Sequence, residues 1–166
     1  MNSPFPRWPA LLGATLFSIL LAATAVRSPA NNFDLIGYVA SVYAQQTEDP
    51  IRLHHLTYAD IEQSIPHKDF TILTETPGYI ATVHNDAEAL RQQIPFYAIR
   101  HAYVQLISSA TSLDISVTKA TFLISAIFAG CSVFLTFMLF SHFKVSLYLI
   151  PFIAFPLGLR EVGSLA

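Results

Sequence analysis

The longest uncharged stretch of the sequence, Ala120 to Ser141, limits the fold more than any other feature. It contains 22 residues without an Asp, Glu, Lys or Arg. About 20 apolar residues in a helix, at 1.5 Å each, cross the hydrocarbon core of a bilayer. Composition agrees, because 53% of the 166 residues are hydrophobic and only 12% are charged, about half the charged share of ordinary soluble domains. The stretch therefore predicts a transmembrane helix over residues 119–141.

A second uncharged stretch, Pro9 to Val26, has 18 residues and predicts a transmembrane helix over residues 9–26. A cleaved signal peptide is the alternative, because Arg7 precedes the stretch and the Ala-Thr-Ala sequence at 23–25 resembles a cleavage site. The stretch is long for a signal peptide, and the membrane segments that follow it favour a retained anchor.

The third apolar segment, Val145 to Leu159, has 15 residues and contains Pro151 and Pro156. Proline removes a helix hydrogen bond, so we expect a short, proline-broken transmembrane segment over residues 145–159. Together the three segments predict a mainly α, multi-pass membrane protein.

Basic residues indicate how the chain is oriented in the membrane. Arg7 precedes the first segment, and His142 and Lys144 lie between the second and third, so the positive-inside rule places both sites in the cytoplasm. Residues 28–118 then face outward from a plasma (inner) membrane, and the N-terminus is cytoplasmic. That region has four bases and ten acids (Arg52, Lys68, Arg91, Arg100; Asp34, Glu48, Asp49, Asp60, Glu62, Asp69, Glu75, Asp86, Glu88, Asp114). The formal charge of the whole chain, -2, gives no reason to expect a nucleic-acid partner.

The region 28–118 is too long for a simple connection and too apolar for a disordered one, so it predicts an extracytoplasmic loop domain. We expect helices over 34–45, from a Thr57 cap to Ser64, from an Asn85 or Asp86 cap through Gln93, and over 95–110. The first and last of these have apolar stripes and adjoin membrane segments, so we expect them to be amphipathic interfacial helices. Between them we expect a short strand over Phe70–Leu73 and a turn at 76–78.

Asp34 is the first candidate for chemistry, because it lies between a membrane segment and the predicted helix over 34–45. One interpretation is an N-cap or first-turn acid that the helix dipole favours. The other is a carboxylate at the outer interface, where a low dielectric strengthens its attraction for a proton or a cation.

Arg100 is the second candidate, at the edge of the apolar stripe of the helix expected over 95–110. It either snorkels or forms a surface pair, or its guanidinium binds a phosphate at the membrane surface. His54 and His55 have no third and fourth ligand at a recognisable spacing, so we predict no metal site from the residues alone. We expect four tyrosines to anchor helices at the headgroup level (Tyr38, Tyr43, Tyr97, Tyr103).

Taken together, these features resemble the N-terminal part of C-type (GT-C) polytopic membrane glycosyltransferases, such as protein mannosyltransferases and aminoarabinose transferases. An acid follows the first membrane segment in "FDLIGYVASVYA", and a Pro-Phe-Tyr sequence begins "IPFYAIRHAYVQLISSATSLDIS". The segment "VTKATFLISAIFAGCSVFLTFMLFSHF" is similar to the family's second membrane helix. The likeness covers residues 9–166 and rests on this overall pattern rather than on a signature motif.

The resemblance implies transfer of a sugar from a polyprenyl-phosphate donor on the outer face of the membrane. It implies that Asp34 is a general base or a metal-associated acceptor site, and a divalent metal is compatible because some members use one. Arg100 is our candidate for the donor phosphate but matches no family position. Members have eight or more membrane helices, so the resemblance also implies that residues 1–166 are an N-terminal portion and are inactive alone. The alternative is a non-catalytic small membrane protein whose outward domain binds a partner.

Overall fold

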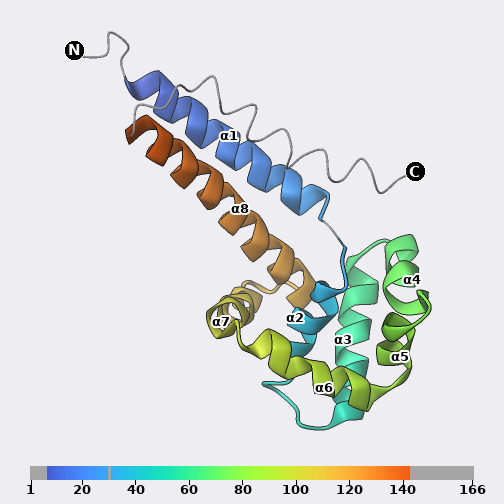
Figure 1. Cartoon of the computed structure of the whole chain (residues 1–166). Coiled ribbons are helices and arrows are strands. Elements are labelled where there is room, and N and C mark those ends of the chain that lie inside the picture. Colours follow the sequence, from blue (N-terminus) through green and yellow to red (C-terminus); the bar gives the residue numbers. More distant parts are fainter. Residues whose placement is uncertain (1–6, 30, 143–166) are drawn as a thin grey trace. The chain divides into compact units, whose positions relative to one another are not determined.

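The computed structural model describes residues 7–29 and 31–142, which are mainly helical and contain no strand. The helices are α1 (Arg7–Arg27), α2 (Asp34–Tyr43), α3 (Pro50–Ser64), α4 (His67–Glu75), α5 (Tyr79–Asn85), α6 (Ala87–Ala98), α7 (His101–Ala110), the 3-10 turn η1 (Thr111–Leu113) and α8 (Val117–His142) (Figure 1). The mainly α fold class is therefore confirmed for this part of the chain. The segment predicted over 145–159 lies outside the described residues.

Helix α8 contains the segment Val117–Phe140, which is 24 residues long and apolar enough to cross a membrane. It is the one such segment in the described part of the chain, and few of its side chains are buried. The apolar part of α1, Leu11–Arg27, is shorter. The structure is thus consistent with membrane association through one candidate span.

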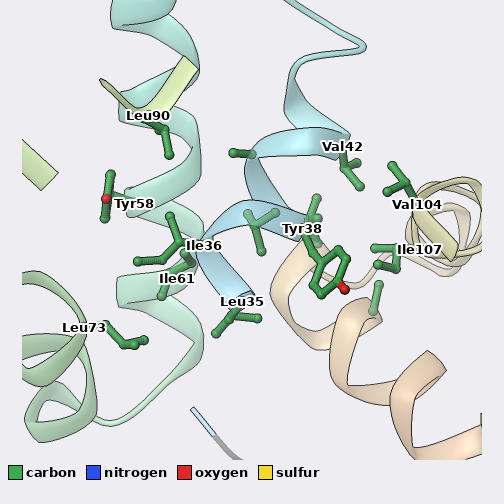
Figure 2. Close-up of a cluster of buried hydrophobic side chains, with 14 of the residues drawn as sticks. Leu35, Ile36, Tyr38, Val42, Tyr58, Ile61, Leu73, Leu90, Val104 and Ile107 are labelled. Atoms are coloured by element: carbon green, nitrogen blue, oxygen red, sulfur yellow. The ribbon is translucent and has the colours of Figure 1, made fainter. Parts of the chain in front are cut away.

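The chain divides into two compact units, and the unit Ala22–Phe128 contains all of α2 to α7. Its centre is α2, where every residue from Leu35 to Val42 is buried. Figure 2 shows Ile36 beside Ile61 of α3, and Tyr38 and Val42 on the side that faces α7. The predicted apolar residues of this helix therefore pack inside the protein on all sides, rather than along one stripe that a membrane would cover.

Asp60 of α3 forms hydrogen bonds to the start of α8. Its Oδ2 accepts the backbone N–H of Val117 and its Oδ1 accepts that of Thr118, both at 3.0 Å. Its Oδ2 also accepts the hydroxyl of Tyr43 at 2.8 Å. The first N–H groups of a helix have no partner within the helix, so this carboxylate satisfies two of them from another element. A hydrogen bond of 2.9 Å joins the hydroxyl of Ser64, the last residue of α3, to that of Ser116, the residue before α8.

The prediction of a helix that starts from a Thr57 cap is wrong, because Thr57 is a fully buried residue inside α3. The helix begins seven residues earlier. Asp49 is its N-cap and accepts the Ile51 N–H at 3.0 Å, and Pro50 follows at the first helical position. An acidic cap followed by proline is the stronger start signal.

The predicted strand over Phe70–Leu73 is also wrong, because these residues belong to α4. Phe70, Leu73 and Thr74 are partly or fully buried and follow helical spacing, three and four apart. The turn at 76–78 is confirmed, and Gly78 there has a φ of 100°, which glycine adopts without steric cost.

The Asp86 cap of α6 is confirmed by its 2.9 Å contact with the Glu88 N–H. The continuous helix predicted over 95–110 is wrong, because Pro95 lies inside α6 and that helix ends at Ala98. Arg100 has a non-helical ψ of 49°, and α7 starts after it at His101. The result is a corner at 99–100 that leaves Ile99 81% exposed.

Candidate functional site

Asp34 is the first residue of α2, and its side chain is exposed. The N-cap position belongs to Phe33, where no side-chain cap bond forms. The N-cap alternative for Asp34 is therefore wrong, and the first-turn alternative is confirmed. The positive end of the helix dipole favours a carboxylate at this position, so Asp34 suits the exposed first turn of a helix whose residues from Leu35 to Val42 are buried.

Tyr97 of α6 contacts this carboxylate. Its hydroxyl donates a hydrogen bond of 3.0 Å to Oδ1 of Asp34, across 63 positions of sequence. The second carboxylate oxygen, Oδ2, accepts no hydrogen bond from the described residues. It is therefore available to an incoming group. The contact also joins the two sequences that carry the glycosyltransferase resemblance, the acid of "FDLIGYVASVYA" and the tyrosine of "IPFYAIR".

Gly37 makes room for the Tyr97 ring. A β-carbon at Gly37 would overlap Cδ2, Cε2 and Cζ of that ring. Asp34, Gly37 and Tyr38 are spaced three and four apart, so they share one face of α2. Glycine in a helix interior costs about 0.5–1 kcal/mol relative to alanine, and here its missing side chain lets a ring from α6 lie against the helix backbone.

The environment of Tyr97 keeps its hydroxyl protonated. Burial is the largest cause that raises the pKa of Tyr97, followed by the hydrogen bond to Asp34, the charge of Asp34 and the neighbouring Tyr79, and together they raise it from 10.0 to about 12. Below that pH the tyrosine is a neutral hydrogen-bond donor. Its hydroxyl therefore donates to the Asp34 carboxylate and helps to fix the position of that side chain.

A row of aromatic rings in contact with one another extends from Tyr97 to the corner between α6 and α7. Tyr38 makes edge-on contacts with Tyr97 and Tyr103, with ring centroids 5.2 Å and 4.8 Å apart. Arg100 places its Cζ 5.5 Å from the centroid of the Tyr38 ring, a distance at which a cation is attracted to the ring face. Tyr38 is buried, so it packs within the protein and the headgroup-anchor prediction is wrong for it.

A cavity of about 760 Å³ lies beside Arg100. One part of its lining is polar, from Arg100, His101 and Ser125, and the rest is mainly apolar, from Tyr38, Tyr103, Ile99, Ala102, Leu106 and Phe128. Ser125 and Phe128 belong to the candidate membrane span, and the hydroxyls of Tyr103 and Ser125 are 2.6 Å apart. The structure therefore brings both predicted site residues to one side of α2, Asp34 at its first turn and Arg100 over Tyr38.

Two other histidines, His54 and His84, contact each other on α3 and α5. His54 lies in α3, and its Nε2 is 2.7 Å from the backbone oxygen of His84. Burial, and then the nearby His54, lower the pKa of His84 below its usual value. The described residues contain no group of three His, Cys, Asp or Glu side chains that could hold a metal ion.

Tyr97 and Gly37 are the site residues that sequence reasoning missed. The Pro-Phe-Tyr sequence singled out the segment that contains Tyr97, but nothing in the residues pairs that tyrosine with Asp34. A glycine inside an apolar helical pattern was the available signal for a close approach. Comparisons of the chain with protein-family models, with curated proteins and with solved structures found no match.

Proposed function

We propose that the chain is the N-terminal portion of a multi-pass membrane glycosyltransferase that takes its sugar from a polyprenyl-phosphate donor. The observation that carries this proposal is the Asp34 carboxylate, exposed at the first turn of a buried helix and held through one oxygen by Tyr97. A general base must be fixed in place and still have an oxygen free for the proton it accepts.

In the proposed reaction, Oδ2 of Asp34 accepts the proton of an acceptor hydroxyl or amine. The acceptor atom forms a bond to the anomeric carbon of the donor sugar. The bond between that carbon and the phosphate oxygen breaks, and the polyprenyl phosphate leaves with its negative charge. Tyr97 positions the carboxylate and does not exchange its own proton, in keeping with its raised pKa.

The cavity beside Arg100 supports a site for the donor phosphate. A guanidinium binds phosphate oxygens through several N–H donors in a fixed plane. The apolar side chains Ile99, Leu106 and Phe128 in the same lining suit the first isoprene units of the donor. Ser125 and Phe128 come from the candidate membrane span, and this supports the proposal that the cavity receives a lipid-linked substrate.

Donor binding is tested with farnesyl monophosphate as the probe and uncharged farnesol as its control. We expect the detergent-solubilised chain to bind the phosphate more tightly than the alcohol, and Arg100→Gln to remove that preference. Arg52→Gln is the matched control, because Arg52 lies on the exposed side of α3. Equal binding of the two probes by the unmodified chain would contradict the assignment of Arg100.

The function itself is tested in cells with Asp34→Asn at the chromosomal gene. We expect the lipid-linked sugar donor to accumulate, because its transfer stops while its synthesis continues. Asp86→Asn is the control, since it neutralises an acid that only caps a helix and asparagine caps equally well. Donor levels that stay normal in the Asp34 variant, with the protein at normal abundance, would favour the non-catalytic, partner-binding alternative.

A further inference from the structure

A second cavity, of about 720 Å³, shares no lining residue with the cavity beside Arg100. The end of α1 contributes Val26 and Arg27, and the first two turns of α8 contribute Lys119, Phe122 and Leu123. The rest of the lining comes from the segment between α1 and α2, from the end of α3 and the two residues after it, from α4 and from the segment before α8 (Ser28, Pro29, Asn31; Ser64, Ile65, Pro66; Asp69; Ile115). The cavity therefore opens beside the first residues of the candidate membrane span.

The charges in this cavity are unbalanced. Arg27 and Lys119 are both exposed, and neither forms an ion pair with any described residue. The single carboxylate in the lining, that of Asp69, accepts a hydrogen bond of 2.8 Å from Nδ2 of Asn31. Two unpaired cations against one carboxylate leave an excess of one positive charge, which is complementary to an anion.

The apolar lining indicates what carries that anion. Phe122 and Leu123 extend from Lys119 along the candidate span, and Val26 and Ile65 add to the apolar surface. A free phosphate ion would make no use of these side chains, whereas a phospholipid contacts apolar and cationic groups together. Basic pockets next to membrane helices bind anionic lipid headgroups in this way.

We propose that this cavity binds the headgroup of an anionic phospholipid of the surrounding bilayer, with Arg27 and Lys119 on the phosphate. The acyl chains then run along Phe122 and Leu123 of α8. Bound lipid then fixes the height of the loop domain above the bilayer, and with it the height of Asp34. The inference does not depend on the proposed glycosyltransferase function, because it uses none of the residues of that site.

The test reconstitutes the full chain into nanodiscs that contain phosphatidylcholine and phosphatidylglycerol, and native mass spectrometry then identifies the lipids that stay bound. We expect phosphatidylglycerol to be enriched over its share of the bilayer. A Lys or Arg near an anionic surface contributes about 1 kcal/mol, which is about fivefold in affinity. Arg27→Gln and Lys119→Gln should each lower the enrichment about fivefold, and Arg27→Lys should largely restore it.

The matched control is Arg91→Gln, which removes an exposed arginine that is already paired with Glu88 at 2.6 Å. Enrichment that survives the double variant Arg27→Gln/Lys119→Gln would overturn the proposal, as would an unmodified chain that retains both lipids in their bilayer ratio. Displacement of the bound lipid by farnesyl monophosphate would assign the cavity to the substrate instead and would also overturn it. Asp34→Asn should leave the enrichment unchanged, so failure of this inference and failure of the proposed function are distinguishable.

Discussion

Tyr97 and Asp34 are 63 positions apart in the sequence, and the hydroxyl of one donates to Oδ1 of the other at 3.0 Å. The tyrosine reaches the carboxylate across Gly37, where a β-carbon would overlap its ring. The contact therefore depends on three residues of two helices, α2 and α6. It holds an exposed carboxylate in one position beside an aromatic surface that ends at Arg100.

Gly37→Ala should displace the Tyr97 ring and break its hydrogen bond to Asp34. Overpacking of this kind costs about 1–3 kcal/mol, so the denaturant midpoint of the loop domain should fall and the tyrosine near-ultraviolet circular dichroism should change. Gly13→Ala is the control, because a β-carbon at Gly13 meets nothing within 4 Å. A Gly37→Ala protein with the same midpoint and spectrum as the unmodified protein would show that the ring does not lie across α2.

Asp60→Ala should detach the start of α8 from α3. The substitution removes the acceptor of the Val117 and Thr118 N–H groups and of the Tyr43 hydroxyl. We expect a loss of about 2–4 kcal/mol in the free energy of unfolding, measured by urea denaturation in detergent. Asp86→Ala removes a cap with a single N–H partner and should cost only about 1 kcal/mol. Equal effects of the two substitutions would contradict the assigned role of Asp60.

Tyr97 should make the stability of the domain depend on pH in the alkaline range. Its pKa in the folded state, about 12, lies above the ordinary value of 10.0, so the folded state holds the phenolic proton more tightly than the unfolded state. The resulting stabilisation is fully present below pH 10 and is lost as the pH rises through about 12.

The difference in tyrosinate absorbance between the unmodified protein and Tyr97→Phe isolates this titration. Asp34→Asn should move its midpoint down toward 10 without reaching it, because burial is the largest cause of the shift and stays in place. A midpoint that does not respond to Asp34→Asn would contradict the contact between the two side chains.

The predicted orientation places residues 28–118 outside the cytoplasm. In a Cys131→Ser background, Gln63→Cys should react with a membrane-impermeant thiol reagent added to intact cells, because Gln63 is exposed on α3. Cys131 in the unmodified chain should stay unlabelled, since it lies inside the candidate span. A cysteine at position 63 that reacts only after the membrane is permeabilised would reverse the orientation.

The features that the sequence predicts well depend on residues close together in the chain. The uncharged run over 120–141 identifies α8, and the acidic cap at Asp86 identifies the start of α6. The errors occur where a local pattern has two interpretations. Pro95 suits the first turn of a helix, yet it lies near the end of α6. The four residues Phe70–Leu73 are too few to distinguish the period of a strand from that of a helix.

The site was only half predictable, for a similar reason. Asp34 and Arg100 stand out because each is a charged residue beside an apolar pattern, and the structure brings both to one side of α2. Tyr97 and Gly37 complete the site through contacts between helices, which no local spacing encodes. The same holds for Asp60, whose partners at Val117 and Thr118 lie 57 and 58 positions away.

The proposed catalytic role of Asp34 is tested most directly by the rate of sugar transfer from a radiolabelled polyprenyl-phosphate sugar, measured in membranes that contain the protein as the cell makes it. A positioned general base contributes about 10²–10⁴-fold to a rate. We predict that Asp34→Asn lowers the transfer rate at least about 100-fold and that Tyr97→Phe lowers it less, with both proteins at normal abundance. Transfer by the Asp34→Asn membranes at the unmodified rate would contradict the claim that this carboxylate is catalytic.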